Sequence, residues 1–232
     1  MVKKALAASL AIVAQVAASE ARAEGNENAG GLYDGRTLRT GGEAFVEGGF
    51  PGVGVGVLFG TSENIDLGLR ATLTYSGLGV YGTGQFTAGA GFDPRIVARF
   101  AVANGKVASL LFRLEPGVRF AHFDPSLRWG PEIVAAMDFG LHVMRRGTIY
   151  LGVEIPIYLD IPNTTPANPF AVLIPILFGA GFEYHATEHI GFGARVNPGV
   201  EIEAGDIKGA PLTSFALLAQ GYFILRWGAM AL

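Results

Sequence analysis

The sequence contains no cysteine, few charges and very little lysine. The absence of cysteine excludes a disulfide scaffold, a cysteine-ligated metal site and a cysteine nucleophile. Only 16% of the residues are charged and the net charge is -3, so no basic signature for nucleic acid is present. Beyond residue 40 no stretch of eighteen apolar residues runs without polar interruption, and we therefore expect no helical membrane span.

Hydrophobic residues make up 50% of the 232 residues, and aromatic residues 11%. This composition excludes a disordered chain. The length fits one domain or at most two small ones.

The first residues have the layout of a secretory signal. Lys3 and Lys4 precede an apolar stretch over 5–18, and Ala21-Arg22-Ala23 offers a small-x-small cleavage site. We predict a cleaved Sec-type signal peptide over 1–23; the alternatives are cleavage after Ala18 or a soluble amphipathic helix. Residues 24–41 are polar and glycine-rich and predict a flexible periplasmic lead-in.

The dominant hydrophobic period from residue 42 onward is two, which is typical of strands with two different faces. In 149–160, for example, isoleucine, leucine and valine alternate with Tyr, Gly, Glu, Pro and Asp. Short polar turns alternate with longer connections, as in an up-and-down barrel. We predict a barrel domain over 42–232 with ten strands. The alternative is eight, if the segments around residue 51 form one strand and another strand is lost to keep the number even. The predicted strands are 42–49, 52–60, 65–76, 84–103, 106–121, 131–144, 148–160, 169–186, 190–204 and 212–227.

Five prolines, Pro94, Pro116, Pro156, Pro175 and Pro198, lie inside predicted strands. Each removes one ladder hydrogen bond. We interpret them as bulge positions because the period of two continues past most of them; the alternative is that they break the strands.

The apolar face of these strands is predicted to meet lipid. A soluble barrel exposes its polar face and carries many charges there, yet only Lys106 and Lys208 are lysines after residue 23. In lipid, only a closed barrel satisfies the backbone of a sheet. The alternative is a soluble periplasmic barrel that binds a small hydrophobic ligand.

With its signal, its alternating strands and segments such as VGVLFG (55–60), DLGL (66–69) and AQGYFILRW (219–227), the chain resembles the small bacterial outer-membrane β-barrel proteins. The resemblance covers 42–232 plus the signal. It implies an antiparallel transmembrane barrel in the outer membrane, with the lipid bilayer and the barrel-assembly machinery as partners. We expect a monomer.

The polar faces carry many charges, and buried charges must pair or contact water. We expect a charge cluster that fills the lumen, formed by Arg70, Arg99, Arg113, Glu115, Arg119, Asp138, Glu154, Glu183, Arg195 and Glu201. For such a barrel we expect a structural or adhesive role, exerted through its loops. Because carboxylates outnumber arginines on these faces, the alternative is a narrow, mildly cation-preferring passive channel.

Loop contacts are predicted at Arg128, Trp129 and Asn163, within the connections near 122–131 and 160–169.

No motif predicts an enzyme, a cofactor or a metal site. Ser109 and His142 are placed near the same rim on adjacent strands, but no oxyanion motif accompanies them. His185 and His189 straddle a strand end, where their spacing does not bring them together, and we expect an exposed polar turn there.

Overall fold

The computed structural model describes residues 31–38, 41–80, 86–123, 126–162, 171–205 and 213–227. The predicted signal peptide and Asn163 lie outside these ranges. Among the described residues no helix is long and apolar enough to cross a membrane. The strands are β1 (Gly42–Phe50), β2 (Gly52–Ser62), β3 (Ile65–Val80), β4 (Phe86–Asn104), β5 (Ala108–Phe123), β6 (Ser126–Met144), β7 (Gly147–Pro162), β8 (Ala171–His185), β9 (Ile190–Gly205) and β10 (Thr213–Trp227).

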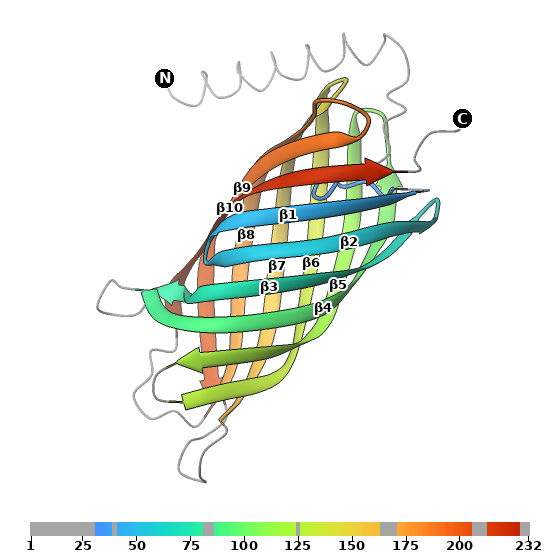
Figure 1. The fold of residues 1–232 in the computed structure, drawn as a ribbon. Coiled ribbons are helices and arrows are strands. Elements are labelled where there is room, and N and C mark those ends of the chain that lie inside the picture. Colours follow the sequence, from blue (N-terminus) through green and yellow to red (C-terminus); the bar gives the residue numbers. More distant parts are fainter. Residues whose placement is uncertain are drawn as a thin grey trace, which may run out of the picture.

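The ten strands form one closed antiparallel barrel in which each strand pairs with its neighbours in sequence (Figure 1). The sheet closes where β1 pairs with β10, from Gly42 opposite Trp227 to Phe50 opposite Ala219. This confirms the predicted all-β, ten-stranded antiparallel barrel.

The β1–β2 hairpin is shorter than its neighbours and ends at Pro51. Beyond it, β3 continues to Val80 and pairs directly with β10, with Phe215 opposite Val80 and Ala216 opposite Gly79. At that end the sheet is therefore closed by β3 to β10 alone. The alternative of eight strands is wrong, because β1 and β2 are two separate strands that pair with each other.

The two ends of the barrel differ in their connections. The tight-turn rim carries the turns at 63–64, 105–107, 145–146 and 186–189. The opposite end, the long-loop rim, carries the connections 81–85, 124–125, 163–170 and 206–212, which lie outside the described residues. This alternation agrees with the predicted up-and-down order.

The predicted loop over 122–131 is wrong, because β5 and β6 continue through most of it. Arg128 lies opposite Ala121 and Pro162, and Trp129 opposite Phe120 and Ile161. Both predicted loop contacts are therefore strand residues: neighbouring strands on both sides extend far enough to pair with them.

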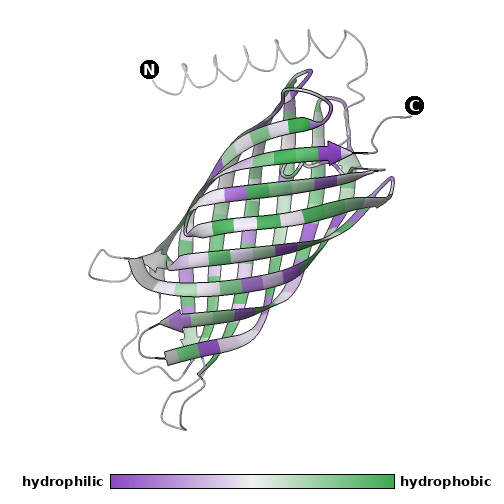
Figure 2. Ribbon diagram, in the orientation of Figure 1, coloured by the Kyte–Doolittle hydropathy of each residue, from purple (hydrophilic) through white to green (hydrophobic). Residues whose placement is uncertain are grey.

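The faces alternate as the period of two predicts, and Figure 2 shows hydrophobic and hydrophilic positions alternating along the strands. Leu69, Ile96 and Phe178 are 57–60% exposed on the outer face. In contrast, every aspartate, glutamate, arginine and lysine of the described strands is buried or half-buried. The charges point into the lumen.

The prolines lie within strands, but the prediction that they mark bulges is wrong. Pro94 lies opposite Ala71 and Pro116 opposite Ile133, in ladders that keep one register past them. The register shifts of the described strands lie elsewhere, for example between Ala101 and Ala103. A proline removes one donor, and the ladder tolerates that loss without an inserted residue.

Candidate functional site

A closed ring of alternating arginines and glutamates crosses the middle of the lumen. We call it the arginine–glutamate ring. Its members come from β1, β3, β5, β7 and β9 and are, in order around the ring, Glu47, Arg70, Glu115, Arg113, Glu154 and Arg195.

The contacts within the ring are mostly short. Arg70 Nη1 lies 3.1 Å from Glu115 Oε1, and Glu115 also pairs with Arg113. Arg113 Nη2 in turn lies 2.9 Å from Glu154 Oε2. Arg195 Nη1 lies 3.1 Å from Glu154 Oε2. Two contacts of 3.8 Å to Glu47, from Arg70 and Arg195, close the ring. Because every member is buried, each charge depends on its neighbours for compensation.

Tyr33 fills the centre of the ring. Its aromatic ring lies 4.2 Å from the Arg195 guanidinium carbon and 5.3 Å from that of Arg113, within cation–π range. Its hydroxyl donates to Glu47 Oε2 at 2.9 Å and accepts from Arg70 Nη2 at 3.1 Å. The ring and this tyrosine together occupy the middle of the lumen.

Tyr33 belongs to residues 31–38, which we call the plug segment. It lies inside the barrel near the tight-turn rim (Figure 1), and its residues are buried. This differs from the flexible lead-in predicted over 24–41. The physical reason is that side chains of the barrel wall form hydrogen bonds with the segment's backbone. These bonds replace the ones that the backbone would otherwise make with water.

Arg99 and Asp66 carry much of this backbone recognition. Arg99 donates to the carbonyl oxygens of Gly31, Leu32 and Arg36 at 2.7 to 3.2 Å, and Asp66 holds Arg99 at 2.6 Å. The amide of Leu38 donates to Asp66 Oδ1 at 3.0 Å.

The plug segment also packs backbone against backbone on β6. Gly35 has a φ of +78°, a left-handed conformation that favours glycine. Its partner is Gly140, where an added Cβ would overlap the carbonyl oxygen of Asp34. The two glycines thus permit a close approach that side chains would prevent.

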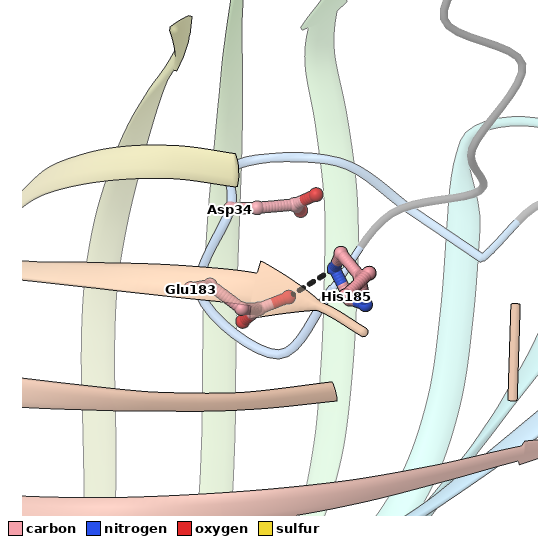
Figure 3. A group of neighbouring side chains, drawn as sticks. All are labelled: Asp34, Glu183 and His185. Carbon is pink, nitrogen blue, oxygen red and sulfur yellow. Dashed lines mark ion pairs between the residues drawn. The ribbon is translucent and has the colours of Figure 1, made fainter. Parts of the chain in front are cut away.

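Asp34, Glu183 and His185 form a buried cluster between the plug segment and β8 (Figure 3). One ligand atom from each lies within 4.8 Å of the others, and Glu183 Oε1 is 2.8 Å from His185 Nε2. Arg226 supplies a positive charge here, with its Nη2 3.9 Å from Glu183 Oε1 and 3.4 Å from His185 Nε2. We therefore interpret the cluster as an ion-paired anchor of the plug segment. It also shows that the exposed turn expected at His185 is wrong for that residue, which is buried, whereas His189 is exposed.

The charge on Asp34 is stabilised by its surroundings. Burial alone favours the neutral acid, but the Arg36 guanidinium holds the pKa of Asp34 below its usual value. The Asp34 carboxylate also accepts a hydrogen bond from the Arg36 amide at 3.0 Å.

Ser109 and His142 do meet, but in an arrangement that anchors the plug segment. Ser109 Oγ lies 2.8 Å from His142 Nε2 and donates its one proton to the Asp34 carbonyl at 2.7 Å. Nε2 must then be the donor to Ser109, and Nδ1 accepts from Thr148 at 2.9 Å. A nucleophilic serine needs a base that accepts its proton, which is the opposite polarity.

The half of the lumen toward the long-loop rim contains a cavity of about 370 Å³. The filled lumen expected from the sequence is therefore found only in the tight-turn half. Among the residues that line the cavity are the ring members Glu47, Arg70, Glu154 and Arg195, the charged residues Asp93, Arg95, Arg119, Arg128, Asp160, Glu201 and Glu203, and the apolar residues Leu78, Tyr158, Leu173 and Leu218.

The structure divides the predicted charge cluster among three places. Arg70, Arg113, Glu115, Glu154 and Arg195 form the ring with Glu47, and Asp138 pairs with Arg113 at 3.3 Å. Arg99 and Glu183 hold the plug segment. Arg119 and Glu201 line the cavity, as does the predicted loop residue Arg128, whereas Trp129 points outward. Sequence reasoning missed Tyr33, and its one signal is an aromatic residue within a polar glycine-rich segment.

No protein-family model matches the chain, and no curated protein matches its sequence.

Proposed function

We propose that the protein is an outer-membrane β-barrel whose lumen is closed, and that it acts as a structural or interaction protein through its long-loop rim. The observation that carries the membrane assignment is the outer face. Valine, leucine, isoleucine and phenylalanine are exposed along it, and the described strands expose no charged side chain. A water-soluble surface of this area normally carries charges of both signs.

Aromatic side chains near both ends support the same assignment. On the tight-turn side, Phe59 packs against Trp227 and Tyr184 against Phe192, with ring centroids 6.1 and 5.5 Å apart. Toward the long-loop rim, Tyr75 and Trp129 are 56% and 44% exposed. Two such girdles are typical of barrels that span a bilayer. Tyr158, in contrast, is buried in the lumen.

The closed lumen favours a structural or interaction role over the channel. Tyr33 sits in the arginine–glutamate ring, and the tight-turn half below it is occupied by the plug segment. In this proposal the tight turns face the periplasm and the long loops face outward. The bilayer is then the partner of the outer face, and the barrel-assembly machinery inserts the chain.

Membrane fractionation combined with heat-modifiability tests the location. A membrane barrel partitions with the outer membrane and migrates faster on SDS gels unboiled than boiled. Recovery in the soluble periplasmic fraction without a mobility shift would overturn the proposal and support a soluble barrel. In planar bilayers we expect no steady conductance; a stable cation-selective conductance would instead support the channel.

Substitution of one residue on the outer face gives a second test of the membrane location. Arginine at Leu69, which is 59% exposed, should destabilise a barrel refolded in lipid vesicles by about 2–4 kcal/mol if the site lies near the bilayer midplane. Leu69→Phe is the matched apolar control. In a soluble barrel the same arginine would face water and change the free energy of unfolding by no more than about 0.5 kcal/mol.

A further inference from the structure

The cavity in the long-loop half has the arginine–glutamate ring at its inner end, and among the described residues that line it carboxylates outnumber arginines. The ring members Glu47, Arg70, Glu154 and Arg195 form its floor and compensate one another. Above them, four carboxylates line the cavity: Asp93, Asp160, Glu201 and Glu203.

The arginines above the floor offset these carboxylates only in part. Arg95 is held by two glutamates, with Nη1 3.1 Å from Glu115 Oε2 and Nε 3.0 Å from Glu132 Oε1. Of the described residues that line the cavity above its floor, Arg119 and Arg128 then stand beside four carboxylates, an excess of negative charge. A concave site with an excess of one sign and low-dielectric walls attracts ions of the opposite sign.

One of the carboxylates has an unused acceptor. Asp93 is 4% exposed, and its Oδ1 has no hydrogen-bond partner although it lines the cavity. A buried carboxylate oxygen without a donor is costly, and a donor supplied by a ligand would remove that cost. This oxygen therefore points to an occupant that donates hydrogen bonds.

The cavity also has an apolar side. Leu173 on β8 lies opposite Glu203 on β9. Leu218 lies two residues from Gln220 on β10, which pairs with β9 on its other side. Leu78 packs against the cluster that contains Leu218. Carboxylates and leucines thus lie side by side on neighbouring strands.

We infer that this cavity binds a small aliphatic amine, whose ammonium groups meet the carboxylates of β4 and β9 and whose hydrocarbon part lies against Leu78, Leu173 and Leu218. The volume of about 370 Å³ lies at the small end of the range of ligand sites, which suits a molecule of this size. The inference rests on the lumen and does not require the barrel to lie in a membrane.

Isothermal titration of the detergent-solubilised full chain with 1,4-diaminobutane tests this inference. We expect saturable one-site binding of the diamine. 1,4-Butanediol, which has the same length and no charge, and succinate, which has the opposite charge, should not bind. Absence of saturable binding, or equal binding of the diol, would overturn the inference.

Three variants locate the site. Glu201→Gln and Asp93→Asn remove one charge each from the cavity with little change of shape, and each should raise the Kd for the diamine at least fivefold. Glu188→Gln, in an exposed turn at the tight-turn rim, should leave the Kd unchanged. Equal weakening in all three would place the binding outside the cavity and refute the inference.

Heat-modifiability of each variant shows whether it is folded before titration. If Asp93→Asn does not fold, Glu201→Gln decides the outcome; if neither folds, the competition of sodium ions with the diamine in the wild-type chain decides it. Binding that is insensitive to salt would then contradict the inference. Membrane partition is measured separately, so failure here leaves the proposed location standing.

Discussion

The two halves of the lumen are built from the same kind of strand but are filled differently. In the tight-turn half the chain's own residues 31–38 occupy the space, and wall side chains bind their backbone. In the long-loop half charged side chains surround a cavity. The wall side chains of a ten-stranded barrel therefore do not fill its lumen by themselves, and the plug segment fills the remaining space in one half. The arginine–glutamate ring forms the boundary between the two halves.

The comparison also shows that the position of an arginine in the lumen determines how many carboxylates it contacts and hence how much it should stabilise the barrel. Arg113 is 1% exposed and contacts three carboxylates, those of Glu115, Asp138 and Glu154. Arg128, toward the long-loop rim, is only half-buried and its Nε has no hydrogen-bond partner.

The largest expected effect follows from this difference. Arg113→Ala leaves buried carboxylates without their cation and should lower the free energy of unfolding by about 3–5 kcal/mol. Arg128→Ala should lower it by no more than about 1 kcal/mol. Urea titration of the heat-modifiable form in vesicles measures both. Similar losses for the two variants would show that the halves do not differ as described.

The close approach of the plug segment to β6 gives the next effect. A methyl group at Gly140 overlaps the Asp34 carbonyl, so Gly140→Ala should cost about 1–3 kcal/mol or displace the segment. Because the chain has no cysteine, Thr37→Cys provides a unique label at a buried position. Its maleimide labelling should become at least tenfold faster in Gly140→Ala. Gly221→Ala, where the added Cβ meets only ordinary contacts, is the control; an unchanged rate in Gly140→Ala would argue against docking of the segment on β6.

The smallest effect concerns one hydrogen bond. Ser109→Ala removes the donor to the Asp34 carbonyl and should cost about 1 kcal/mol. Thr74→Ala, on the cavity wall, should cost less, since that side chain lies beside open space. If Ser109→Ala abolished a hydrolytic activity of the wild type instead, the anchoring role assigned to Ser109 would have to be replaced by a catalytic one.

The local sequence pattern predicted much of the barrel wall. Strand direction reverses at polar turns, and the period of two assigns each side chain to the lumen or the outer face, so residues such as Leu69 and Arg70 could be placed without coordinates. Both signals are local: they depend on residues close in the chain. Their limit appears at 122–131, where composition indicated a loop but pairing with neighbours on both sides extended the strands.

Only the tertiary structure decided which charges pair and what occupies the lumen. Glu47 and Arg195 lie far apart in the sequence but are neighbours in the ring, and nothing in the period of two specifies that contact. The same holds for Tyr33, whose glycine-rich surroundings indicate a flexible segment. Its burial depends on Arg99, Asp66 and the ring, which exist as a binding site only after the barrel has closed. Local backbone geometry determines the wall, whereas the contents of the lumen depend on contacts between distant residues that closure brings together.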